Sequence, residues 1–132
     1  MIKKTMIVLL AGAALFTACK KTETTATTTA QKVLGKWTIV SKFSREYYQG
    51  TWNNYSITGQ AGEYADFRTD GKVYSNFNAS LDTASYAIIS DKLLKFNKDT
   101  FQIKTLTANS FVIYQSEFTA RDSSDATTTL KR

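Results

Sequence analysis

Side chains that commonly do chemistry are scarce in this 132-residue chain. It has no histidine, the side chain that most often serves as general base or metal ligand, and only one cysteine, Cys19. Serine–lysine or paired-carboxylate chemistry stays formally open, but the acidic residues fall mostly in predicted turns. We therefore predict a protein that is not an enzyme, with no catalytic residues, no metal site and no cofactor.

Two carboxylates, Asp66 and Asp70, flank the end of one predicted strand. Oxygen ligands placed in this way can bind Ca²⁺ weakly. The interpretation that we favour is that these carboxylates only solvate the hairpin, because aspartate is common in turns without binding a metal.

The densest set of side chains able to bind by stacking lies in residues 45–62, a stretch far longer than a hairpin needs. The four candidate ligand-binding rings are Tyr47, Tyr48, Trp52 and Tyr55. We expect them to stack on a small apolar or ring-containing molecule, with Asn53 and Asn54 supplying hydrogen bonds. The alternative is an Ω-loop that packs its own rings and binds nothing.

The first 18 residues predict an export signal. Two lysines precede the apolar run 6–16, which is too short for a membrane-spanning helix. Residues 15–19, Leu-Phe-Thr-Ala-Cys, resemble the lipobox of bacterial lipoproteins, with Phe16 where that family most often has leucine. The resemblance implies cleavage before Cys19, acylation of its thiol and anchoring in the membrane. Because Lys20 is not the aspartate of an inner-membrane retention signal, the expected location is the outer membrane of the cell envelope, on either face.

The charge of the exported part is modest. Without Lys3 and Lys4, 15 of the 17 basic residues remain against 11 acidic ones, and they are dispersed along the chain. Recognition of nucleic acid needs a concentrated basic patch. We therefore expect no nucleic acid as a partner. The expected partners are the membrane, through the lipid anchor, and a small hydrophobic ligand.

Residues 19–33 predict a flexible linker, since six of the twelve residues from 20 to 31 are threonine and no large apolar side chain is present there. Residues 34–132 then predict one β domain, in which turn signals separate short runs of alternating polarity. The predicted strands are 36–45, 63–69, 72–77, 84–89, 93–96, 100–106, 110–118 and 127–131. Even spacing of short strands is typical of a sandwich or an up-and-down barrel, and closure removes the exposed sheet edges that this proline-free chain cannot guard.

The domain resembles the small lipocalin-like domains of Bacteroidetes lipoproteins. The motifs that carry the resemblance are Leu34-Gly35-Lys36-Trp37, Phe67-Arg68-Thr69-Asp70-Gly71, Tyr86-Ala87-Ile88, Leu106-Thr107-Ala108-Asn109 and Leu130-Lys131-Arg132. The family implies a small barrel of about eight strands, an envelope location and no agreed substrate.

Within that family an arginine packs over the tryptophan at the closed end of the barrel. The resemblance therefore implies that Trp37 plugs one end under a basic side chain, for which Arg132, Lys131 and Arg121 are the candidates. The first loop of lipocalins lies over the open mouth, which would place the four rings there.

Two functions follow from this interpretation. The first is non-covalent binding of a small apolar ligand in the barrel; the second is a structural or accessory interaction module with a filled barrel.

The tripeptide Asp82-Thr83-Ala84 also resembles an O-glycosylation acceptor of Bacteroidetes, although an ordinary loop is the interpretation that we favour there.

Overall fold

The computed structural model describes residues 26–119 and 121–132. The elements are α1 (Thr29–Val33), β1 (Gly35–Tyr48), β2 (Thr51–Thr58), β3 (Tyr64–Phe67), β4 (Lys72–Phe77), β5 (Ser80–Ser90), β6 (Leu93–Phe96), β7 (Asp99–Leu106), β8 (Ser110–Phe118) and β9 (Ser123–Lys131).

Eight of the strands close into an antiparallel up-and-down barrel in the order β1-β3-β4-β5-β6-β7-β8-β9. Closure occurs at β1, which pairs with β3 through its first residues and with β9 along most of its length. The predicted fold class, a small all-β barrel of about eight strands, is confirmed.

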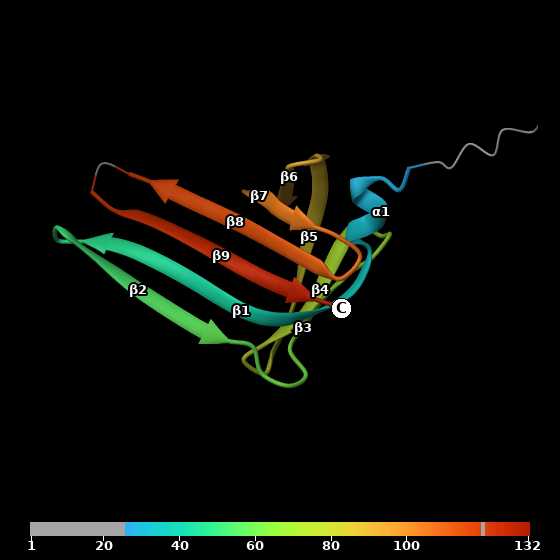
Figure 1. Cartoon of the computed structure of the whole chain (residues 1–132), viewed down its shortest axis with the longest axis horizontal. Coiled ribbons are helices and arrows are strands. Elements are labelled where there is room, and N and C mark those ends of the chain that lie inside the picture. Colours follow the sequence, from blue (N-terminus) through green and yellow to red (C-terminus); the bar gives the residue numbers. More distant parts are fainter. Residues whose placement is uncertain (1–25, 120) are drawn as a thin grey trace, which may run out of the picture.

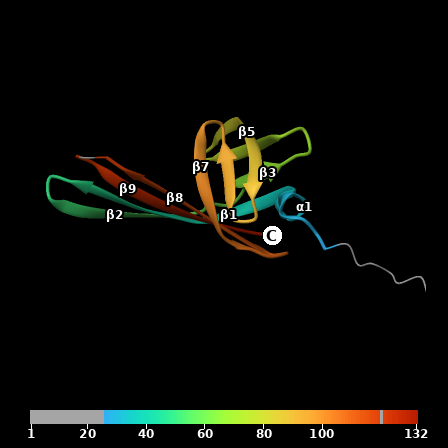
Figure 2. The same ribbon diagram turned by 90° about the horizontal axis from the view of Figure 1, so that it is seen from above.

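The strands differ in length, so the barrel is taller on one side. Residues 41–48 of β1 run past β3 and pair with β2 instead, while β8 and β9 continue beside them. These four strand segments form a sheet that projects beyond the barrel (Figure 1, Figure 2). We call this sheet the extension: β2, residues 41–48 of β1, 123–128 of β9 and 113–118 of β8.

The sequence interpretation missed β2 and shortened β5 and β9. Residues 45–62, expected to be an irregular lid, contain instead the end of β1, a two-residue hairpin turn and β2. In that turn Gln49 and Gly50 have φ of 49° and 83°. Asn78 and Ala79, with φ of 50° and 59°, make the same kind of turn where a loop was expected. Positive φ at both central residues is the geometry of type I′ turns, which match the twist of the flanking strands.

Trp37 closes the barrel at the end beside α1, which we call the lower end; the opposite end is the upper end. It is fully buried, its Nε1 donates to the Val33 carbonyl at 2.8 Å, and its ring lies 5.4 Å from that of Phe111. Of the three basic candidates, Arg132 is the one that covers it, with its guanidinium carbon 3.9 Å from the indole. The same guanidinium donates to the carbonyl oxygens of Lys32, Val33 and Leu34, which ties the C-terminus to the start of β1.

The C-terminal part of the predicted linker is a helix. Thr28 caps α1, and its side chain and that of Gln31 form a reciprocal capping box. Val33 at the end of α1 is fully buried in the core. Residues 29–33, which the sequence placed in the flexible linker, are therefore helical, and the folded domain includes α1.

Candidate functional site

An apolar cavity of about 220 Å³ lies inside the barrel, above Phe67. Its walls come from seven strands, all those of the barrel except β7: Ile39, Ala65, Phe67, Val73, Ser75, Ala84, Phe96, Ile113, Thr128 and Leu130. Ala65, Ser75 and Ala84 point inward yet stay only half-buried, so solvent reaches the space between them.

The cavity exists because small side chains occupy inward positions on three neighbouring strands. Ala65, Ser75 and Ala84 lie on β3, β4 and β5, and Ala65 pairs directly with Ser75. Larger residues there would fill the space, as Trp37 and Phe111 fill the lower end of the barrel. Ser75 and Thr128 are the polar residues of the wall, and no acidic or basic side chain lines it. Such a wall can desolvate an apolar group but offers it no acid–base chemistry.

A buried carboxylate fixes the loops beside the upper end. Glu63 is 5 % exposed and accepts backbone N–H groups from Gln60 and Asn78, each at 2.8 Å. Two charge-assisted bonds compensate its burial. Glu63 thereby joins the connection that follows β2 to the turn between β4 and β5.

The extension has two distinct faces. Ile113 and Thr128 line the cavity and pair with one another, and Thr128 also pairs with Lys42. The face that bears these residues continues the barrel interior, and we call it the inner face. The opposite face, which continues the barrel exterior, is the outer face.

The four predicted rings are divided between these faces. On the outer face Tyr47 pairs with Trp52, their ring centroids 5.3 Å apart, and the Arg45 guanidinium lies 5.2 Å from the Trp52 ring. Tyr48 and Tyr55 belong to the inner face. None of the four lines the barrel cavity, so the lid expected over the mouth is wrong: the strand ladder with β1 holds these residues in a hairpin directed away from the barrel.

An ion pair holds Arg45 in place beside Trp52 and Tyr47 on the outer face. Arg45 donates from Nε and Nη2 to the carboxylate of Asp125, which is 6 % exposed, across the β1–β9 pair. The hydrogen bonds and charge of Asp125 raise the pKa of Arg45 above its usual value. The guanidinium is thus held beside the Trp52 ring.

A shallow groove of about 500 Å³ lies beside the end of the extension. Its lining combines rings, amides, hydroxyls and carboxylates: Glu46, Tyr47, Tyr48, Asn53, Tyr55, Glu117, Thr119, Asp122, Ser123 and Ser124. Three of the four predicted residues, Tyr47, Tyr48 and Tyr55, and also Asn53 therefore line this groove, in polar and exposed surroundings.

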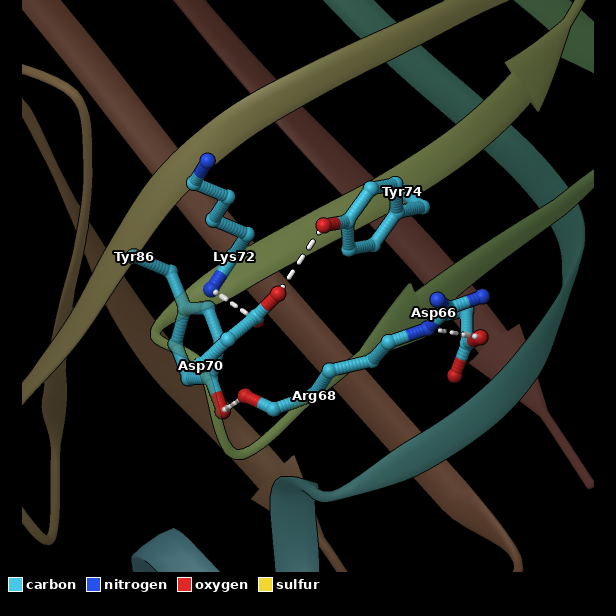
Figure 3. Close-up of polar contacts among 6 residues, drawn as sticks. All are labelled: Asp66, Arg68, Asp70, Lys72, Tyr74 and Tyr86. Atoms are coloured by element: carbon cyan, nitrogen blue, oxygen red, sulfur yellow. Dashed lines mark hydrogen bonds and ion pairs between the residues drawn. The ribbon is translucent and has the colours of Figure 1, made fainter.

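Asp66 and Asp70 are each engaged by protein groups on the barrel exterior (Figure 3). Asp66 accepts from Arg68 at 2.9 Å, and Asp70 accepts from the Tyr74 hydroxyl and the Lys72 N–H, each at 2.9 Å. The bond from Tyr74, followed by that from Lys72, lowers the pKa of Asp70. The two carboxylates thus have separate protein partners, Asp66 on β3 and Asp70 in the turn that follows this strand.

Three further residues lie on or near the β3–β4 turn: Gly71, Tyr86 and Thr83. Gly71 has φ of 77°, which allows the tight turn after Asp70. The Tyr86 hydroxyl donates to the Arg68 carbonyl at 2.8 Å, and burial raises the pKa of Tyr86. Thr83 lies exposed on β5, a strand where a loop was expected.

Other predicted features lie outside the described residues. Cys19, the export signal and the first part of the linker belong to residues 1–25. Within residues 26–119 and 121–132, no helix is long and apolar enough to cross a membrane. The same residues contain no group of three or more histidine, cysteine, aspartate or glutamate side chains placed to hold a metal ion.

Comparison with protein-family models, with curated proteins and with solved structures gave no match to this chain. What the structure shows is an eight-stranded antiparallel barrel with Trp37 under Arg132 at one end, and it identifies no family.

Sequence reasoning missed the cavity wall. Small residues are common in strands, so the sequence does not mark these three, which form a cavity wall only because they point inward on adjacent strands: Ala65, Ser75 and Ala84. The strand register brings them together: Ala65 pairs with Ser75 of β4, and Val73 of the same strand pairs with Ala84.

Proposed function

We propose that the chain is a non-catalytic binding protein whose barrel takes up a small, largely apolar ligand without forming a covalent bond. The observation that supports this is the half-open apolar cavity above Phe67, lined by small side chains where a filled barrel would have large ones. Concave, largely apolar sites with few polar groups are typical of small-molecule binding.

The cavity volume sets the size of the ligand. An apolar cavity of about 150 Å³ holds benzene, so about 220 Å³ suits one substituted ring or a short acyl segment. The hydroxyls of Ser75 and Thr128 offer hydrogen bonds to a single polar substituent. A larger ligand would extend from the cavity towards the inner face of the extension, which continues the same barrel surface.

Toluene provides a direct test. At roughly 0.6–0.8 kcal/mol per heavy atom, it should bind with a Kd on the order of 0.1–1 mM. Saturation-transfer NMR on the folded chain should show saturable binding. Ala84→Phe, which fills the cavity from β5, should abolish it.

The same strand offers a matched control. Ala87 is exposed on the outside of β5, so Ala87→Phe adds the same ring without touching the cavity and should leave toluene binding intact. Ala65→Leu fills the cavity from β3 and serves as a second blocking variant if Ala84→Phe folds poorly. Equal toluene binding by the wild-type chain and by a folded, cavity-filled variant would refute the proposed site.

A lipid anchor in the envelope is part of the proposal and rests on the lipobox-like residues before Cys19. Metabolic labelling with a fatty-acid probe should mark the protein, and Cys19→Ala should abolish the label. Persistent labelling of that variant would contradict the anchor and leave the cavity proposal unaffected.

An accessory interaction module is the second candidate function. The observation that favours it is the extension, which carries exposed rings on both faces and projects away from the barrel (Figure 1). Under this function Trp52→Ala would impair association with a partner while toluene binding in the barrel stayed unchanged.

A further inference from the structure

The free edge of β2 carries an inference independent of the cavity. Among the described residues β2 pairs only with β1, over eight residues and without a register shift. Its sequence, Thr-Trp-Asn-Asn-Tyr-Ser-Ile-Thr, contains no charge and no proline. Natural proteins usually guard such an edge with lysine, proline or a bulge, because its unpaired backbone groups are a template for another strand.

The register shows which backbone groups are free. Tyr48 and Thr51 flank a two-residue turn and so form a hydrogen-bonded pair. The alternation of an antiparallel ladder then directs the N–H and C=O of Trp52, Asn54 and Ser56 away from β1. Thr58 follows the same alternation, and its carbonyl indeed accepts from outside the ladder, from Gln60 Nε2 at 3.1 Å.

We propose that two copies of this chain associate through their β2 edges, antiparallel about a two-fold axis at Asn54. Asn54 would pair with Asn54 of the second copy, and Trp52 with its Ser56. These pairs would form about six backbone hydrogen bonds. The register leaves out Thr58, the residue whose carbonyl is already engaged.

Side-chain size and charge favour a second copy as the occupant. In this register each large side chain of β2 meets a smaller polar one: Trp52 opposite Ser56, Tyr55 opposite Asn53 and Ile57 opposite Thr51. These three large side chains are 44 %, 49 % and 41 % exposed in the single chain, so each has surface to bury. Since β2 is uncharged, a two-fold axis brings no like charges together across the edge.

The shape of the molecule permits this pairing. β2 lies in the extension, which projects beyond the barrel in both views (Figure 1, Figure 2). Antiparallel pairing places the two barrels at opposite ends of the joined sheet. Cα–Cα separations of about 4.5 Å are expected for non-hydrogen-bonded pairs, which Asn53 and Tyr55 of the second copy would form.

Disulfide trapping tests this register. In the full chain carrying Cys19→Ser, Asn53→Cys mixed with a size-tagged Tyr55→Cys should give a cross-linked heterodimer under mild oxidation, because that separation lies within the range for disulfides. Either variant alone should cross-link at least about tenfold less, because in this register residue 53 does not lie opposite residue 53 of the second copy, nor residue 55 opposite residue 55. Equal cross-linking of single and mixed variants would overturn the register.

Sedimentation velocity on the Cys19→Ser chain without other changes tests the association itself. It should show a concentration-dependent dimer, and Asn54→Lys should raise its dissociation constant at least about tenfold by placing two ammonium groups at the axis. Thr83→Lys adds the same charge on an exposed position of β5 and should leave the dimer intact. A monomer up to millimolar concentration, or equal weakening by both lysines, would overturn the proposal without bearing on ligand binding in the barrel.

Discussion

Replacing Trp37 tests how the closed end of the barrel is held. Trp37→Ala removes a fully buried indole, its contact with Phe111 and its hydrogen bond to the Val33 carbonyl. Truncation of a buried tryptophan typically costs about 3–5 kcal/mol. Arg132 would also lose the ring beneath it, at 3.9 Å, a contact of about 0.5–2 kcal/mol. We expect the upper part of the 3–5 kcal/mol range, because several partners are lost together.

Urea unfolding followed by circular dichroism measures this loss. Trp37→Phe keeps a ring but loses the Nε1 donor, so it should cost about 1–3 kcal/mol less than the alanine variant. Trp52→Ala is the matched control: Trp52 is 44 % exposed on the extension, and its removal should change the stability by about 1 kcal/mol or less. Equal destabilisation by Trp37→Ala and Trp52→Ala would refute the structural role assigned to Trp37.

Two further predictions concern carboxylates. The pKa of Asp70 is lowered by its bond from Tyr74, so the stability that it contributes is present above the unfolded value of about 3.9 and disappears as pH falls through the folded value. The difference in Tm between wild type and Asp70→Asn should therefore shrink on acidification below about pH 4; a constant difference from pH 7 to pH 2 would contradict this. Glu63→Ala should cost about 1–3 kcal/mol in urea unfolding, because it leaves the N–H groups of Gln60 and Asn78 without their acceptor, and an unchanged unfolding midpoint would count against that role.

Local turn chemistry and the pattern of large inward residues made the barrel predictable. The Asp70-Gly71 pair indicated the β3–β4 hairpin, and Trp37 at the start of the first strand indicated a plugged end. By contrast, β2 left no such signal, because no residue of β2 is buried and its side chains alternate without an apolar face. Gln49 at positive φ is also an uncommon turn residue, so the two-residue turn before β2 was not recognisable.

The candidate site was predicted less well than the fold. The rings Tyr47, Tyr48, Trp52 and Tyr55 were recognised as unusual, but the β1–β2 register, which depends on the whole ladder, divides them between two faces. The cavity arises from small residues, and a small residue carries no sequence signal for the space that it leaves. The register of the β3–β4–β5 meander brings Ala65, Ser75 and Ala84 to one wall, and closure of the barrel encloses the space in front of them.

The central claim is that an apolar ligand occupies the space above Phe67 inside the barrel. The most direct measurement is the set of intermolecular nuclear Overhauser effects between toluene and the methyl groups of the methyl-labelled protein. We predict contacts to Ala65, Ala84 and Ile113, which line the cavity. Contacts confined to Ile57 on the extension, or no intermolecular contacts at saturating toluene, would contradict the claim.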